Sequence, residues 1–132
     1  MTDTREPIEE NEQDSIVKER LEKIRRVYGF VPLVSDVLSE RGDMFIPFTD
    51  LTASAFFRPK YLDQKTVELA AISSGTALAS EHCLGVHIEQ AKSLGVSEDE
   101  IFEAMMIGSM MAMNKSQSVA FRKFKESRSH EE

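Results

Sequence analysis

The sequence predicts an all-α protein. Apolar side chains recur at spacings of three and four residues along most of the chain, which is the spacing of one face of a helix. No stretch of convincing length alternates between apolar and polar residues, as a half-buried strand would. The 132 residues suffice for one domain with a proper core and are too few for two ordinary ones. We therefore expect about six or seven helices, in a single domain over residues 14–128.

Three helices are expected in the N-terminal half. Residues 1–13 are polar and acidic, and we expect them to form a mobile arm. The first helix then covers residues 14–28, and a short second helix covers residues 33–41. The third is expected over residues 46–57, because Pro47 fits in a first helical turn but not in a helix interior. We expect the aromatic side chains of this segment in the core: Phe45, Phe48, Phe56 and Phe57.

The sequence of the C-terminal half predicts four more helices. Asp63 caps a helix that continues to residue 79, and its many small residues let a neighbouring helix approach closely. A second helix covers residues 81–94. The sequence SEDE at residues 97–100 is a capping box, and it opens a helix over residues 98–114. A last amphipathic helix carries Val119, Phe121 and Phe124.

Methionines cluster in the helix expected over residues 98–114: Met105, Met106, Met110, Met111 and Met113. Methionine-rich stretches can bind soft copper ions, but far more often they pack flexibly in a core or an interface. Met106, Met110 and Met113 share a stripe, whereas Met105 lies on another face. Because this helix is apolar on most sides and Gly108 permits close approach, we expect part of it at a subunit interface.

The charge of the chain excludes several classes of partner. The net charge is −7 and the pI about 5.0, whereas nucleic-acid binding normally requires a basic patch. The one basic cluster, at residues 122–128, has acids beside it and is interpreted as a solvated helix face. No apolar run approaches the roughly 20 residues that span a bilayer, and the acidic N-terminus does not read as a secretory signal. We therefore expect a cytoplasmic protein that binds neither nucleic acid nor membranes.

The stretch ALASEHCLGVHIEQA at residues 77–91 contains the only cysteine, Cys83, which lies between His82 and His87. On a helix, Cys83 and His87 share a face one turn apart, with Cβ atoms roughly 5–6 Å apart. The imidazole could then draw a proton from the thiol, and the unpaired N–H groups of a first helical turn favour a thiolate. Two alternatives stay open. One is an inert buried cysteine; the other is a metal site with Glu68 as a third ligand, although a closed zinc site needs four.

These residues resemble the redox pattern of the carboxymuconolactone decarboxylase family, and more closely that of its alkylhydroperoxidase D (AhpD) branch. The pattern is a glutamate, eleven further residues and then C-x-x-C-x-x-x-H. Here Glu68 is followed by LAAISSGTALA and then by SEHCLGVH. Cys83 matches the second cysteine, His87 the family histidine, and Ser80 stands where the first cysteine would be. His82 matches a histidine often found between the two cysteines. The flanking segments LDQKTVELAAIS and HIEQAKSLGVSEDEIFEAM are also similar to the family.

The resemblance implies an AhpD-like helical bundle that assembles into homotrimers or homohexamers. It also implies an antioxidant oxidoreductase, either a disulfide reductase or an alkylhydroperoxidase-type peroxidase, with a small peroxide or a disulfide as substrate. Carried over from the family, Cys83 is the nucleophile, and Glu68 and His87 form the proton relay, which His82 tunes. An external thiol or dithiol closes the cycle. We expect no cofactor and no metal ion.

Ser80 interrupts this chemistry, because a hydroxyl cannot form a disulfide with Cys83. The thiol could still become a sulfenic acid or a mixed disulfide, but it could resolve neither internally. We therefore expect impaired two-thiol turnover. Either Ser80 is an engineered substitution that traps an intermediate, which the intact surroundings slightly favour, or it is native and the protein relies on an external thiol.

Two other functions stay open. A carboxymuconolactone decarboxylase-type lyase acting on a small lactone acid would use the acid–base residues without a cysteine pair. Such a substrate calls for an arginine or lysine in the pocket, and residues 66–90 supply neither. The third possibility is a non-catalytic oligomeric binding protein whose site has decayed.

Overall fold

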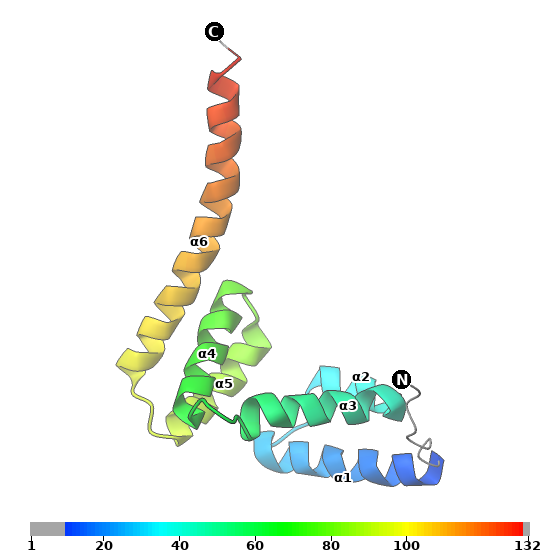
Figure 1. Cartoon of the computed structure of the whole chain (residues 1–132). Helices are drawn as coiled ribbons and strands as arrows, with labels where there is room; N and C mark the ends of the chain where they lie inside the picture. Colours follow the sequence, from blue (N-terminus) through cyan, green and yellow to red (C-terminus); the bar gives the residue numbers. More distant parts are fainter. Residues whose placement is uncertain (1–9, 131–132) are drawn as a thin grey trace. The chain divides into compact units, whose positions relative to one another are not determined.

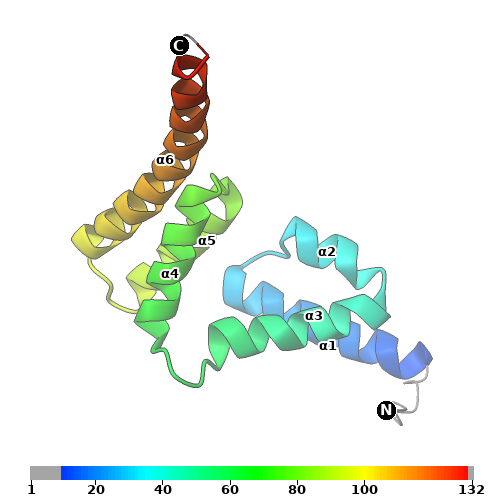
Figure 2. The ribbon, with the colours of Figure 1, turned by 45° about the horizontal axis from the view of Figure 1, so that its top comes forward.

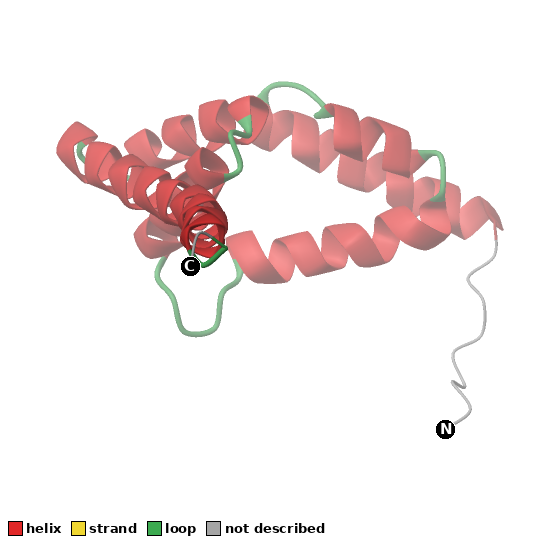
Figure 3. Ribbon diagram, turned by 90° about the horizontal axis from the view of Figure 1, so that it is seen from above, coloured by secondary structure: helices red, strands yellow, loops and turns green. Residues whose placement is uncertain are grey.

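The computed structural model describes residues 10–130, and all regular structure within them is helical (Figures 1 and 3). The α-helices are α1 (Glu10–Tyr28), α2 (Leu33–Ser39), α3 (Gly42–Thr52), α4 (Gln64–Ala77), α5 (Glu81–Ser93) and α6 (Glu98–Arg128); a π-helical turn, Ala53–Phe57, follows α3. The prediction of an all-α fold is confirmed. Helix α1 begins earlier than expected, and residues 1–9 of the predicted arm lie outside the described part of the chain.

The chain divides into two compact units, one ending at Arg58 and the other beginning at Pro59. The first contains α1, α2, α3 and the π-helical turn, and the second contains α4, α5 and α6. The single domain expected over residues 14–128 stays a prediction. No helix among the described residues combines the length and the apolar character needed to cross a membrane.

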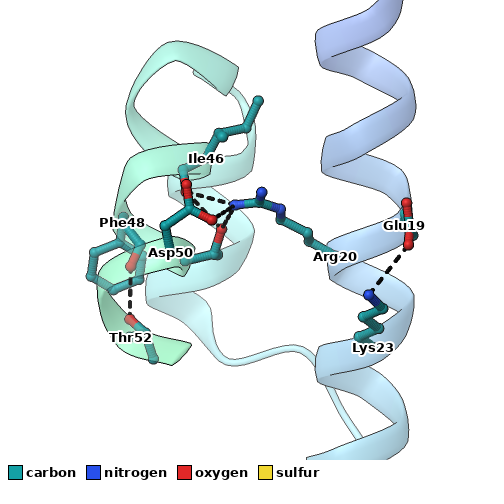
Figure 4. Close-up of polar contacts among 8 residues, drawn as sticks. Glu19, Arg20, Lys23, Ile46, Phe48, Asp50 and Thr52 are labelled. Carbon is teal, nitrogen blue, oxygen red and sulfur yellow. Dashed lines mark hydrogen bonds and ion pairs between the residues drawn. The ribbon is translucent and has the colours of Figure 1, made fainter. Parts of the chain in front are cut away.

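In the N-terminal unit, Arg20 ties α1 to α3 (Figure 4). Its Nη1 donates hydrogen bonds to the carbonyl oxygen of Ile46 at 2.7 Å and to Thr49 Oγ1 at 2.6 Å. The same nitrogen lies 2.8 Å from Asp50 Oδ1. The Arg20 side chain is only about a quarter exposed, so these charge-assisted bonds fix the contact between the two helices.

The predicted start of α3 is wrong, because the helix begins at Gly42 and Pro47 lies inside it. Pro47 removes one backbone hydrogen bond from the helix. The additional turn places Phe45, which is fully buried, in the core of this unit. Apolar burial of an aromatic side chain is worth roughly 1.5–3 kcal/mol, which offsets the lost bond. Of the four phenylalanines expected in the core, only Phe45 is fully buried; Phe48 and Phe57 are exposed, and Phe56 is half-buried.

The C-terminal unit is built around α4, which packs against both α5 and α6 (Figures 1 and 2). Its core joins one residue of α4 to residues of the other two helices and of the connecting loop: Ile72, Ala91, Val96, Ile101 and Ala104. The small residues of α4 permit this packing, as expected. A Cβ at Gly75 would lie 3.3 Å from Leu84 of α5. A Cβ at Gly108 of α6 would lie 3.2 Å from Thr76 Cβ and closer still to the carbonyl oxygen of Ser73.

Helix α6 begins as predicted, with a capping box. Ser97 Oγ accepts the Glu100 amide N–H at 3.1 Å, and Glu100 Oε1 accepts the Ser97 amide N–H at 3.1 Å. The hydrogen bond from the Ser97 backbone N–H to the carboxylate, followed by that of the Ser97 side chain, holds the pKa of Glu100 below its usual range. The two helices expected after residue 98 are instead one, because the segment NKSQS at 114–118 contains no glycine or proline to end the first.

Candidate functional site

The centre of the candidate site is a buried contact between Glu68 of α4 and His87 of α5. His87 Nδ1 lies 2.7 Å from Glu68 Oε2, and the two side chains are 14% and 6% exposed. Glu68 lies on the face of α4 that also buries Ile72 and Gly75. Glu68 is therefore not a solvated charge on the helix surface. A carboxylate this deeply buried requires a polar partner, and His87 provides it.

The pair has the arrangement of an acid–base group. A carboxylate that accepts the Nδ1 proton orients the imidazole and stabilises its protonated form. Proton exchange with a reacting group would then take place at the other ring nitrogen, Nε2. Because the Leu84 side chain of α5 packs directly on Gly75 of α4, the two helices that carry Glu68 and His87 are held close together. The pair is therefore pre-organised.

The turn between α4 and α5 positions the rest of the site. Ala79 adopts a left-handed backbone conformation, with φ of 51°. The Ala79 N–H donates to the carbonyl of Thr76 at 3.0 Å, and the Ser80 N–H donates to that of Gly75 at 2.9 Å. This is the Schellman ending of a helix, usually made by glycine. This turn is not predicted from the sequence, because an alanine stands where a glycine would have marked it.

Ser80 and Cys83 lie at the start of α5, as predicted. Ser80 is the N-cap residue, but its side chain makes no capping hydrogen bond. This differs from Asp63 and Ser97, whose side chains cap α4 and α6. Cys83 lies in the first turn of α5 and is exposed. Cys83 is therefore not the buried core residue that the inert alternative requires.

The other predicted residues take different places. His82, next to Cys83, is exposed on the first turn of α5. The structure brings Glu68 and His87 into direct contact and places Cys83 one helical turn before His87 on the same helix. The metal alternative is not supported, because no three His, Cys, Asp or Glu side chains within residues 10–130 lie so that they could hold an ion together.

The family model for the carboxymuconolactone decarboxylase family matches residues 43–126, which is well over half of the chain. The chain belongs to this family. The matched region runs from α3 to near the end of α6 and contains every residue of the candidate site. Neither the comparison with curated proteins nor that with solved structures gives a match. The family contains both AhpD-type peroxidases and decarboxylases, so membership establishes the fold and leaves the reaction to be argued from the site.

Proposed function

We propose that this member of the carboxymuconolactone decarboxylase family is a thiol-dependent redox enzyme, with Cys83 as nucleophile and Glu68 and His87 as its proton relay. The observation that carries the proposal is the buried Glu68–His87 pair, one helical turn from an exposed thiol. A thiol must be accessible to attack a substrate, whereas its proton acceptor works best where water is excluded. The site meets both conditions.

The proposed first step reduces a hydroperoxide. The Cys83 sulfur attacks one peroxide oxygen, the O–O bond breaks, the sulfur becomes a sulfenic acid and the substrate leaves as an alcohol. The thiol proton passes to His87, and His87 returns a proton to the leaving alkoxide. Glu68 stabilises the imidazolium between these two transfers. Thiol and hydroperoxide are thereby converted to sulfenic acid and alcohol.

The return to the thiol requires an external reductant, because Ser80 cannot supply a second sulfur. One external thiol condenses with the sulfenic acid, which releases water and leaves a mixed disulfide at Cys83. A second external thiol attacks that disulfide, restores Cys83 and leaves as the oxidised reductant. Ser80 makes no side-chain cap for α5, so capping of this helix does not account for a serine at the position.

The experiment compares hydroperoxide-dependent consumption of dithiothreitol by the wild type and three variants. Cys83→Ala should abolish turnover, and Ser80→Cys should raise it when the reductant is limiting. Ser80→Ala is the matched control and should behave as the wild type. Peroxide turnover that survives Cys83→Ala would contradict the proposal. Conversion of a lactone acid that survives Cys83→Ala but not His87→Ala would show the lyase alternative instead.

A further inference from the structure

Helix α6 carries two apolar faces, only one of which is covered within its own unit. The covered face packs on α4 and contains Ile101, Ala104 and Gly108, all in the first third of the helix. This corrects part of the expectation for Gly108, whose close approach is to α4 of the same chain. At about 1.5 Å per residue, α6 is more than twice as long as α4, and its C-terminal half projects beyond it (Figure 1).

The second face, which we call the outer stripe, has a regular spacing. Its positions follow one another at intervals of four, three, four, three and four residues: Met106, Met110, Met113, Gln117, Ala120 and Phe124. The methionines of the outer stripe are 42–48% exposed, and Phe124 is 56% exposed. Alternation of four and three residues is the repeat by which two helices pack along each other as a coiled coil. A polar residue such as Gln117 within such a seam is a common device for fixing register.

The charges of α6 are separated toward its two ends. Its first two turns are acidic, with Glu98, Asp99, Glu100 and Glu103, and its last two are mainly basic, with Arg122, Lys123, Lys125 and Arg128. Two copies of α6 packed antiparallel would place the acidic end of each beside the basic end of the other. A parallel pair would place like charges together, which is unfavourable. The charge pattern of α6 therefore favours a second copy of α6 as the partner and an antiparallel orientation of the two helices.

We propose that the outer stripe is a docking surface for the outer stripe of a second copy of this chain, with the two α6 helices antiparallel. This assigns a role to the basic cluster at residues 122–128, interpreted above as a solvated helix face. The proposal does not depend on the redox chemistry of Cys83. The two can fail separately, because the tests below measure association and orientation and not turnover.

The first test measures association of the full-length chain by sedimentation velocity over a range of concentrations. Met110→Glu places a charge in the outer stripe and should raise the dissociation constant at least tenfold. Met111→Glu is the matched control, because Met111 is the neighbouring methionine on a different face of α6, 63% exposed against 46% for Met110, and it should leave association unchanged. Far-UV circular dichroism checks that both variants keep their helical content. A wild type that stays monomeric, or an equal effect of the two substitutions, would overturn the proposal.

The second test establishes orientation by disulfide formation, in a Cys83→Ser background. Met113 lies at the midpoint of α6, so Met113→Cys should cross-link to its own copy in an antiparallel pair. Phe124→Cys alone should not, because the two copies would lie roughly 30 Å apart along the helices. A mixture of Ala120→Cys and Met106→Cys proteins should give the mixed dimer, because these two positions lie seven residues on either side of Met113. Efficient self-cross-linking of Phe124→Cys, or no cross-link at Met113→Cys, would overturn the antiparallel arrangement.

Discussion

Glu68 and His87 should be strongly coupled in the free energy of unfolding, and the coupling is measured by changing each residue alone and both together. Glu68→Leu and His87→Leu each leave the other polar group buried without its partner. Because both side chains are at least 86% buried, solvent screens the loss very little. Removal of one partner from such a pair costs about 3 kcal/mol of unfolding free energy.

The double variant removes both polar groups, and apolar replacements of a buried pair are often close to neutral. We therefore expect it to be more stable than the His87→Leu single variant, which requires a coupling energy above about 3 kcal/mol when each single variant costs about 3 kcal/mol. Urea unfolding followed by circular dichroism, at one protein concentration for all variants, gives the four free energies of the cycle. The exposed pair Glu19–Lys23, at 3.3 Å in α1, is the matched control and should show a coupling below about 0.5 kcal/mol. Additive effects of Glu68→Leu and His87→Leu would refute the reasoning.

Three further predictions concern the backbone and the caps. Ala79→Gly should stabilise the protein by about 1 kcal/mol in thermal or urea unfolding, because glycine adopts the left-handed conformation without strain. Gly95→Ala, at the equivalent turn after α5 with φ of 82°, should destabilise it by a similar amount. Gly108→Ala should destabilise by roughly 2 kcal/mol, because the clash with the α4 backbone outweighs the higher helix propensity of alanine, whereas Gly85→Ala, with open space around its Cβ, should stabilise slightly. The pKa of Glu100 is lowered in the folded state. The stability that its carboxylate contributes is therefore present above the ordinary glutamate pKa and is lost as the pH falls through the folded-state pKa. The melting temperature of Glu100→Gln should accordingly fall less on acidification than that of the wild type.

Each of these has a clear contrary result. Equal effects of Ala79→Gly and Gly95→Ala would show that the two turns do not share the Schellman geometry. A stabilising Gly108→Ala would mean that α4 and α6 lie further apart than the structure places them. If the melting temperature of Glu100→Gln fell with pH as much as that of the wild type, the Glu100 carboxylate would not contribute to the capping box.

Helical periodicity predicted the fold class because each α-helix buries one face, and the spacing of apolar residues within a single segment is enough to show that face. The boundaries that failed are those decided by tertiary contacts. The additional first turn of α3 exists because Phe45 is buried in the core, and a proline normally argues against it. The continuity of α6 follows from the lack of a stop signal at residues 114–118, where two separate helices were expected.

The candidate site was predicted in part for the same reason. Cys83 and His87 lie on one helix, so their spacing alone places them one turn apart. The contact between Glu68 and His87 joins two helices, and only the family resemblance suggested it before the structure placed the two side chains 2.7 Å apart. The left-handed turn at Ala79 left no mark in the sequence, because alanine is not a turn-forming residue.

The proposal that Cys83 is a redox nucleophile is tested most directly by trapping its oxidised form. The protein is treated with a hydroperoxide in the presence of dimedone, which reacts with sulfenic acids, and the modified peptide is mapped by mass spectrometry. The trap is necessary because the seven methionines also take up oxygen. We predict a dimedone adduct at Cys83 that forms at least tenfold more slowly in His87→Ala, since general base catalysis contributes about 10²–10⁴-fold. No adduct at Cys83, or an equal rate in wild type and His87→Ala, would contradict the account.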